Sequence, residues 1–191
     1  FLLVPICIAV FLSSIGFTVF IAIQHHPFRP RHWSLTAKLT TVTTLFFFAF
    51  GAFFWGLFEW NNPATIGDYS AGDKVLNAIF ASVMMRSGGF NLVDMSSITP
   101  VSTLLTDMLM FIGGGSGSTA GGVKVTTIAV IALSILAEAR GDQKVVAFNR
   151  TIPESSLRIA ISVIVMGATV VGVGAASILI ISGADLKEVI F

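Results

Sequence analysis

A glycine pair beside an arginine is the first feature of the sequence with a recognisable chemistry. The residues concerned follow Arg86 at the end of a short apolar run: Ser87, Gly88, Gly89, Phe90 and Asn91. An extended strand containing glycine can point several backbone carbonyls one way, because glycine tolerates the dihedral angles that this requires. Carbonyls arranged in that way replace the hydration shell of a cation. The alternative is an interfacial turn that only caps the preceding helix.

A tract of small residues, called here the glycine loop, interrupts a later apolar run. Its members are Gly113, Gly114, Gly115, Ser116, Gly117, Ser118, Thr119, Ala120, Gly121 and Gly122. Each glycine costs a helix up to about 1 kcal/mol, so this density predicts an unwound segment. Irregular backbone is tolerated at membrane depth only where it borders protein or a water-filled cavity. A phosphate-binding loop is excluded because no strand precedes the tract and Val123 separates Gly122 from Lys124.

Arg86 and Lys124 are two basic residues within otherwise apolar sequence. An unpaired charge at membrane depth costs at least about 2.5 kcal/mol, so Arg86 is expected to bind Asp94, Asp107 or backbone carbonyls behind the glycine pair. The alternative is an Arg86 that lies near the outer surface and is solvated. For Lys124 we expect a carboxylate partner near the glycine loop, or a side chain that reaches the cytoplasmic interface.

The composition shows what kind of elements must position these residues. Hydrophobic residues make up 54% of the chain and charged residues only 11%, against about 25% charged in soluble domains. Long apolar runs cover residues 1–23, 45–58 and 159–181, and about 20 such residues cross a bilayer as a helix. The sequence therefore predicts an all-α integral membrane protein. The single cysteine, Cys7, excludes an intrachain disulfide.

The segments follow from these runs and from their polar breaks. We expect helices over residues 1–24, in 39–138 and in 157–191, and basic connectors over 25–38 and 139–156. The run 75–85 is too short to cross a membrane. The run 100–139 is too long for one crossing, since a straight helix of that length measures about 60 Å, and we expect it to break at the glycine loop. The chain is interpreted as a fragment that begins inside a helix.

The distribution of basic residues predicts the topology. Seven of the eleven lysines and arginines lie in or beside the connectors 25–38 and 139–156, and basic loops remain on the cytoplasmic side. Both connectors face the same side only if the run 75–85 dips into the membrane and returns without crossing. The charges therefore favour a re-entrant loop, and nothing in their pattern points to a nucleic-acid partner.

The two motifs, taken in this order, resemble the Trk/Ktr/HKT superfamily of potassium transporters, and most of all the bacterial Trk/Ktr-type membrane subunit. The resemblance implies helix–pore-loop–helix repeats, four of them around one pore, as in a potassium channel. Residues 1–24 then end the second repeat, 39–138 form the third with its filter at 86–91, and 157–191 begin the fourth. Ser87 and Gly88 depart from the threonine and alanine common in that family, and Gly88 loosens the strand.

The resemblance also implies roles and partners. Potassium is expected at the backbone carbonyls of Ser87, Gly88 and Gly89, and the glycine loop with Lys124 is expected to gate the pore. A homodimer is implied, mounted on a cytosolic nucleotide-binding ring of the RCK type, in the plasma membrane of a bacterium. No cofactor is expected besides the transported K⁺ or Na⁺.

Three other functions remain open from the residues. One is a Na⁺/K⁺ transporter of the same superfamily. Another is a secondary transporter whose broken helix binds the substrate. The last is an enzyme or receptor with a site inside the membrane, for which Arg86, Asp107 and Lys124 are the candidate residues.

Overall fold

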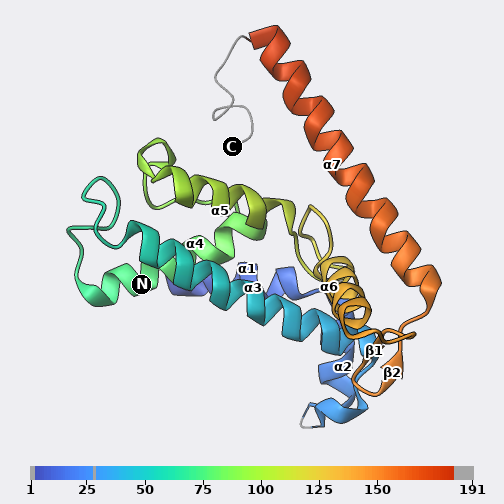
Figure 1. Ribbon diagram of the computed structural model, residues 1–191. Helices are drawn as coiled ribbons and strands as arrows, with labels where there is room; N and C mark the ends of the chain where they lie inside the picture. Colours follow the sequence, from blue (N-terminus) through green and yellow to red (C-terminus); the bar gives the residue numbers. More distant parts are fainter. Residues whose placement is uncertain (1–2, 28, 183–191) are drawn as a thin grey trace. The chain divides into compact units, whose positions relative to one another are not determined.

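The computed structural model describes residues 3–27 and 29–182, and these fold mainly as helices (Figure 1). The helices are α1 Leu3–Ile15, α2 Phe17–His25, α3 Leu35–Glu59, α4 Ala71–Ser87, α5 Pro100–Phe111, α6 Val125–Arg140 and α7 Glu154–Ser182, with 3₁₀ turns η1 Pro30–His32 and η2 Met95–Ser97. A hairpin of β1 Val146–Ala147 and β2 Arg150–Thr151 lies between α6 and α7. The predicted all-α architecture is confirmed. Parts of the predicted segments 1–24, 25–38 and 157–191 lie outside the described residues.

The chain divides into two compact units, Phe1–Thr126 and Thr127–Phe191. The first contains α1 to α5 and the glycine loop, and therefore all the predicted site residues. The second contains most of α6, the hairpin and α7. The hairpin turn at Phe148 and Asn149 has positive φ angles of 49° and 61°, and the sequence reading did not predict it.

Three helices of the first unit begin at short polar side chains. Ser34, Ser70 and Thr99 precede α3, α4 and α5, and each hydroxyl accepts a hydrogen bond of 3.2–3.3 Å from the backbone N–H three residues further on. Such N-caps satisfy backbone donors that have no partner inside the helix. Pro100 occupies the first turn of α5, where its missing N–H costs nothing. These caps fix where each helix starts.

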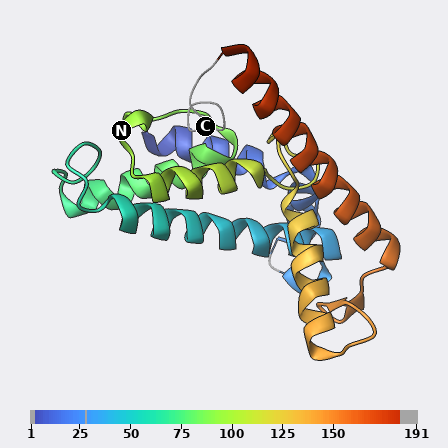
Figure 2. The same ribbon diagram turned by 45° about the horizontal axis from the view of Figure 1, so that its top comes forward.

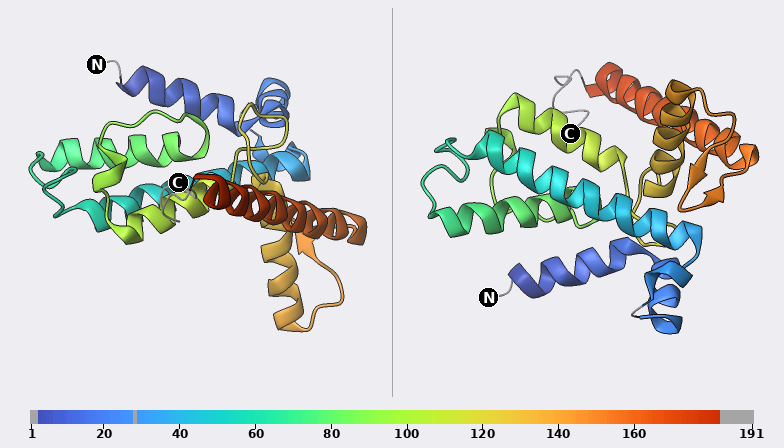
Figure 3. Two further views of the ribbon diagram at one scale, coloured as in Figure 1. Left: turned by 90° about the horizontal axis from the view of Figure 1, so that it is seen from above. Right: turned by 60° about the horizontal axis from the view of Figure 1, so that its bottom comes forward.

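Helices α3, α4 and α5 lie side by side (Figures 1 and 2). Gly51 of α3 permits the close approach, because a Cβ at this position would lie 2.6 Å from Ser82 Oγ of α4. The same Ser82 hydroxyl donates to the carbonyl of Phe48 at 2.8 Å. Trp55 and Leu109 are buried in the apolar core between the helices. Figure 3 shows that α4 also lies between α5 and α1.

Among the described residues two helices, α3 with 25 residues and α7 with 29, are long and apolar enough to cross a membrane, and α1 with α2 would make a third as one broken span. The segment 1–24 was expected to form one continuous helix, and its described part does not. It breaks at Gly16 into α1 and α2, which are bent by 91°. Gly16 has φ +95°, a backbone conformation that ends a right-handed helix and that only glycine adopts readily.

The other expected breaks and bounds are close to those observed. The run 100–139 divides into α5 and α6 at the glycine loop, as its length predicted. Helix α4 is longer than the predicted run 75–85 and ends at Ser87. Helix α3 begins at Leu35, four residues before the predicted start, because Ser34 provides the N-cap.

Candidate functional site

Helix α4 runs back along α3 and ends beside its middle. Near the start of α4, the Lys74 ammonium donates to the carbonyl of Trp60 at 2.8 Å, directly after the end of α3. Near its end, Arg86 Nη1 donates to the carbonyl of Thr44 at 3.3 Å. Thr44 precedes Glu59 by 15 residues, or about 22 Å along a helix. Helix α4 thus reaches more than halfway down α3.

The chain then returns to the end of α3 at which α4 began. Both the N–H and the hydroxyl of Thr99, the N-cap of α5, donate to Glu59 Oε1 at 2.9 Å. Glu59 Oε2 accepts from Asn62 Nδ2 at 2.7 Å and from the Thr65 hydroxyl at 2.8 Å. Glu59 is fully buried, and such a carboxylate is tolerated because it accepts four hydrogen bonds. The segment from α4 to α5 therefore enters and leaves at the same end of α3.

The residues predicted to coordinate a cation lie at the far end of α4. Ser87 is the last residue of the helix, and Gly88 still has helical angles, φ −98° and ψ −35°. The N–H groups of Gly88 and Gly89 both donate to the carbonyl of Met84, at 3.0 and 3.1 Å. Gly89, with φ +68°, is the residue that leaves the helix.

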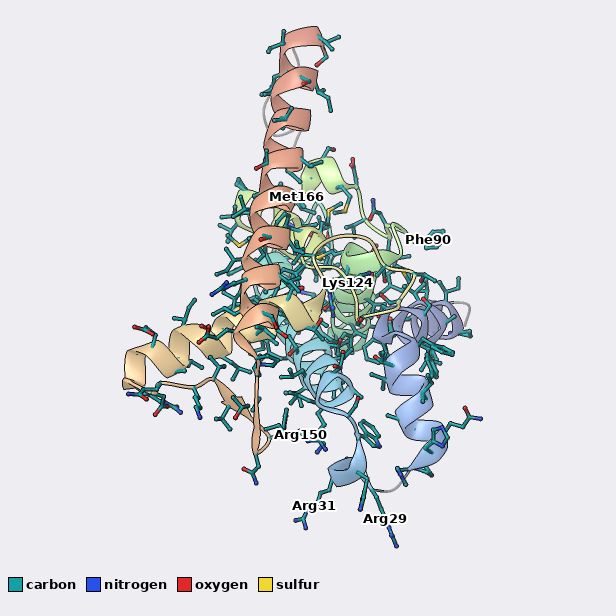
Figure 4. The ribbon with its side chains drawn as sticks, turned by 90° about the vertical axis from the view of Figure 1, so that its right-hand side faces the viewer. Arg29, Arg31, Phe90, Lys124, Arg150 and Met166 are labelled. Atoms are coloured by element: carbon teal, nitrogen blue, oxygen red, sulfur yellow. The ribbon has the colours of Figure 1, made fainter. Side chains whose placement is uncertain are left out.

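The expectation of an extended strand over 87–90 is therefore corrected. The helical conformation persists through Gly88, because the Met84 carbonyl accepts both glycine N–H groups, and non-helical backbone begins at Gly89. Residues 84–89 have the geometry of the alternative, a turn that caps the end of the helix. Beyond it, Phe90 and Asn91 are exposed, and Phe90, at 60% exposure, points away from α4 (Figure 4).

The glycine loop is closed at its base by backbone hydrogen bonds. The N–H of Gly113 donates to the carbonyl of Val123, and the N–H of Val123 donates to the carbonyl of Phe111, both at 2.9 Å. A third bond of 3.1 Å runs from the N–H of Val125, the first residue of α6, to the carbonyl of Gly114. The predicted unwound segment is thus a defined loop between α5 and α6.

Lys124 binds the loop that it follows. Its ammonium group donates to the carbonyl of Ala120 at 2.7 Å and is half-buried (Figure 4). Among the described residues, the expected carboxylate partner is not observed. The loop turns back over Lys124, so the carbonyl of Ala120, four residues earlier in the chain, accepts this hydrogen bond instead.

Arg86 joins the two predicted motifs. Its Nη2 donates to the carbonyl of Gly113 at 2.8 Å, and its side chain is buried, with the whole residue 6% exposed. Of the predicted partners, backbone carbonyls are therefore the ones observed, and the solvated alternative is wrong. Arg86, beside the predicted filter, and Gly113, at the start of the glycine loop, therefore lie together next to Thr44 of α3.

The acidic candidates for Arg86 make other contacts. Asp94 accepts hydrogen bonds from the hydroxyl and the N–H of Ser96, at 2.8 and 2.9 Å, and these hold the pKa of its carboxyl below the usual range. Asp107 Oδ1 is buried with no hydrogen-bond partner among the described residues. Arg86, Asp107 and Lys124 therefore do not form an ion-paired catalytic group. No cluster of three or more metal-binding side chains occurs in the described part of the chain.

The sequence reading missed Gly16, which lies against the glycine loop. The N–H of Gly115 donates to the carbonyl of Ser14 at 2.8 Å, and the N–H of Phe17 donates to the carbonyl of Gly117 at 3.3 Å. A Cβ on Gly16 would lie 2.5 Å from the carbonyl oxygen of Ser116. A glycine inside a long apolar run was the available signal, but it did not reveal a partner a hundred residues away.

Comparison with known proteins gives relatives of one kind. The chain is 34% identical over 179 residues to Ktr system potassium uptake protein B of Bacillus subtilis and 30% identical over 180 residues to that of Vibrio alginolyticus; each match covers 94% of this chain and 40% of the relative. It is 30% identical over 158 residues to the potassium/sodium uptake protein NtpJ of Enterococcus hirae, covering 82% and 34%. The chain thus spans about 40% of the length of the first two relatives.

All three relatives are named for ion uptake, and none for an enzymatic reaction. Together with the apolar helices α3 and α7, they place the chain among multi-pass proteins of the plasma membrane. A family model for TrkH, described as a cation transport protein, matches residues 1–151. The chain belongs to the TrkH family of cation transport proteins.

Proposed function

We propose that the chain is part of the pore of a potassium uptake protein, and that it contributes one of several filter loops together with its gate. The observation that carries this proposal is the geometry of α4 and α5. Both helices end beside the middle of α3, where Arg86 at the end of α4 binds Gly113 at the start of the glycine loop. The names of the relatives in Bacillus subtilis and Vibrio alginolyticus support potassium as the ion.

In this proposal, α4 is a re-entrant pore helix. Its return to Glu59 through Thr99 supports a segment that enters and leaves at one membrane face. The carbonyls of Ser87, Gly88 and Gly89 coordinate K⁺, with Phe90 and Asn91 as their neighbours. The guanidinium of Arg86 is bound to carbonyls on the α3 and glycine-loop side, so in this proposal its charge is directed away from the ion.

The glycine loop is the proposed gate. The loop begins beside the end of α4. In this proposal it is the next part of the chain that an ion meets after it leaves the filter. Its residues carry no bulky side chain, so its backbone can obstruct or clear a narrow path with small changes in dihedral angle. Irregular backbone of this kind at membrane depth is expected to line a watery cavity.

The partners are proposed from the same relatives. The name "Ktr system" indicates a protein that works with further components, and in this proposal these are a cytosolic regulatory ring and a second pore subunit. The basic residues Arg29 and Arg31, beyond α2, point away from the helices (Figure 4). In the proposed topology they lie on the cytoplasmic side.

Two alternatives differ in one measurable property. The relative NtpJ is named for potassium and sodium, so a Na⁺/K⁺ transporter would show little preference between the ions. A secondary transporter would use the break between α5 and α6 to bind its substrate, and its flux would not depend on the residues at the end of α4.

The test is Gly89→Ser in the complete protein, with ion flux measured in liposomes. Gly89 has φ +68° and open space around its Cα, so serine fits sterically but strains the backbone. The ratio of K⁺ to Na⁺ flux is expected to fall at least several-fold. Gly172→Ala, in α7, serves as control because its Cβ meets no atom within 4 Å. An unchanged ratio at normal expression would show that these carbonyls do not select the ion.

A further inference from the structure

The two ends of the glycine loop are held by different kinds of contact. Its base carries three backbone hydrogen bonds and the guanidinium of Arg86, which links it to α3 and α4. A hydrogen bond that involves a charged group is stronger than one between neutral groups. The base is therefore fixed to the helices that carry the proposed filter.

The tip of the loop, residues 115–118, is held mainly by the break between α1 and α2. The N–H of Gly115 binds the carbonyl of Ser14 before the break, and the carbonyl of Gly117 binds the N–H of Phe17 after it. Ser118 has a buried hydroxyl without a hydrogen-bond partner among the described residues. A movement that pairs this hydroxyl would offset part of the cost of displacing the tip, and the tip lacks the charged hydrogen bond that holds the base.

The break places the tip at one end of a short helix. Helix α2 begins at Phe17 and ends at His25, where the basic connector with Arg29 and Arg31 follows. Because α2 meets α1 at 91°, Gly16 is the point about which a displacement of the connector end would turn α2. The N–H of Phe17, which binds the carbonyl of Gly117, belongs to the first residue of this helix.

We propose that the break at Gly16 is a latch for the tip of the glycine loop, and that α2 is the lever that releases it. This inference rests on the proposed function of the loop as a gate. A force applied at the basic connector opens the latch, while Arg86 keeps the base in place. Opening is then a movement of the tip alone.

A disulfide across the latch tests the proposal. A Cβ on Gly117 would lie 3.6 Å from the Cβ of Phe17, within the separation of about 3.5–4.5 Å found in disulfides. The double variant Phe17→Cys, Gly117→Cys is made in the complete protein, with Cys7 and any other native cysteine replaced by alanine. Potassium flux in liposomes is measured after oxidation and again after reduction with dithiothreitol.

Oxidation is expected to form the disulfide and to reduce the flux at least tenfold, and reduction is expected to restore it. Each single cysteine variant is the control, because Gly117→Cys also places a side chain at φ +71°. A disulfide that forms without any loss of flux would show that the latch stays closed during transport. Failure of the disulfide to form would show that the contact is not made. Either result would overturn the proposal.

A second variant is designed to open the latch by a steric conflict and needs no disulfide. Gly16→Ala puts a Cβ 2.5 Å from the carbonyl oxygen of Ser116 and forces a strained φ of +95°, so the tip must leave the break. Resting potassium flux is expected to rise several-fold, and Gly172→Ala is expected to leave it unchanged. A resting flux of Gly16→Ala equal to that of the unaltered protein would contradict the latch.

A deletion separates this inference from the proposed gate. Removal of residues 115–118 takes away the tip and retains the base, and it is expected to raise resting flux. If the deletion raises flux while the disulfide has no effect, the gate stands and the latch is wrong. If the deletion leaves flux unchanged at normal expression, the loop is not the gate, and the latch proposal falls with it.

Discussion

At the scale of single residues, Arg86 determines how the two motifs meet. Its side chain is buried and bound to two backbone carbonyls, Thr44 of α3 and Gly113 of the glycine loop. The planar guanidinium presents several donors in fixed directions, and an ammonium group is a compact charge on a flexible stem. Only arginine holds both carbonyls at once from this position in α4.

We therefore expect Arg86→Lys to lower the stability of the protein and to raise its resting flux. The variant keeps the charge and loses at least one charge-assisted hydrogen bond, which is worth about 1.5–3 kcal/mol. Thermal unfolding in detergent and liposome flux are the measurements. Arg158→Lys is the control, because the Arg158 side chain is 83% exposed and its ion pair is with the similarly exposed Glu154. Equal unfolding temperatures for the two variants would contradict a structural role for Arg86.

At the scale of helices, Glu59 ties the end of α3 to the start of α5. Its carboxylate accepts four hydrogen bonds, two of them from Thr99 and the others from Asn62 and Thr65. These contacts close the hairpin of helices that contains α4. The position of the proposed filter along α3 depends on this closure, because residues 89–98 connect Gly88 to the fixed Thr99.

Glu59→Gln is expected to destabilise this end of the bundle. An amide has one oxygen where the carboxylate has two, so donors that the carboxylate satisfied are left without an acceptor. An unsatisfied buried polar group costs about 1–3 kcal/mol, measurable as a lower unfolding temperature. Glu154→Gln, at an exposed side chain, is expected to change nothing. If both variants unfold at the temperature of the unaltered protein, the four hydrogen bonds contribute no net stability.

The sequence predicted the elements that local rules control. The excess length of 100–139 and its glycines predicted the break between α5 and α6, and the short run 75–85 together with the charges predicted a helix that returns. The bend at Gly16 was missed, because glycine also occurs inside continuous membrane helices. Its cause is a contact with the glycine loop, and no local rule describes a contact between residues 16 and 116.

The site was predictable to a similar degree. Carbonyl partners for Arg86 were one of the expected alternatives, but Asp94 and Asp107 fitted the same charge argument equally well from sequence. The choice depends on α4 ending beside Thr44, which is a tertiary result. The extended conformation was placed two residues too early, since the Met84 carbonyl retains both Gly88 and Gly89 N–H groups.

At the scale of the whole molecule, the chain spans only part of the length of its relatives. It covers about 40% of the two Ktr relatives, and α7 exposes apolar side chains such as Met166, Val170 and Ile180. Such a surface requires lipid or neighbouring helices. The predicted topology places both basic connectors on one membrane side, and α4 is the segment on which that prediction depends.

Cysteine labelling tests this topology in the complete protein. His25 and Gln143 are both exposed, and neither belongs to the lysines and arginines from which the topology was predicted. The variants His25→Cys and Gln143→Cys are expected to react with an impermeant thiol reagent from the cytoplasmic side only. Asp68→Cys, in the exposed turn before α4, is expected to react from the opposite side. The parent protein with Cys7 alone gives the background. Labelling of positions 25 and 143 from different sides would mean that α4 crosses the membrane.

The contact at Gly16 has a consequence for how such proteins vary in evolution. The latch joins backbone atoms of Ser14 and Phe17 to backbone atoms of Gly115 and Gly117, with no side chain taking part in the hydrogen bonds. A substitution at one partner therefore cannot be compensated by a second substitution at the other. Positions 16 and 115 are expected to remain glycine independently of each other, so methods that detect contacts through correlated substitutions will not see this one.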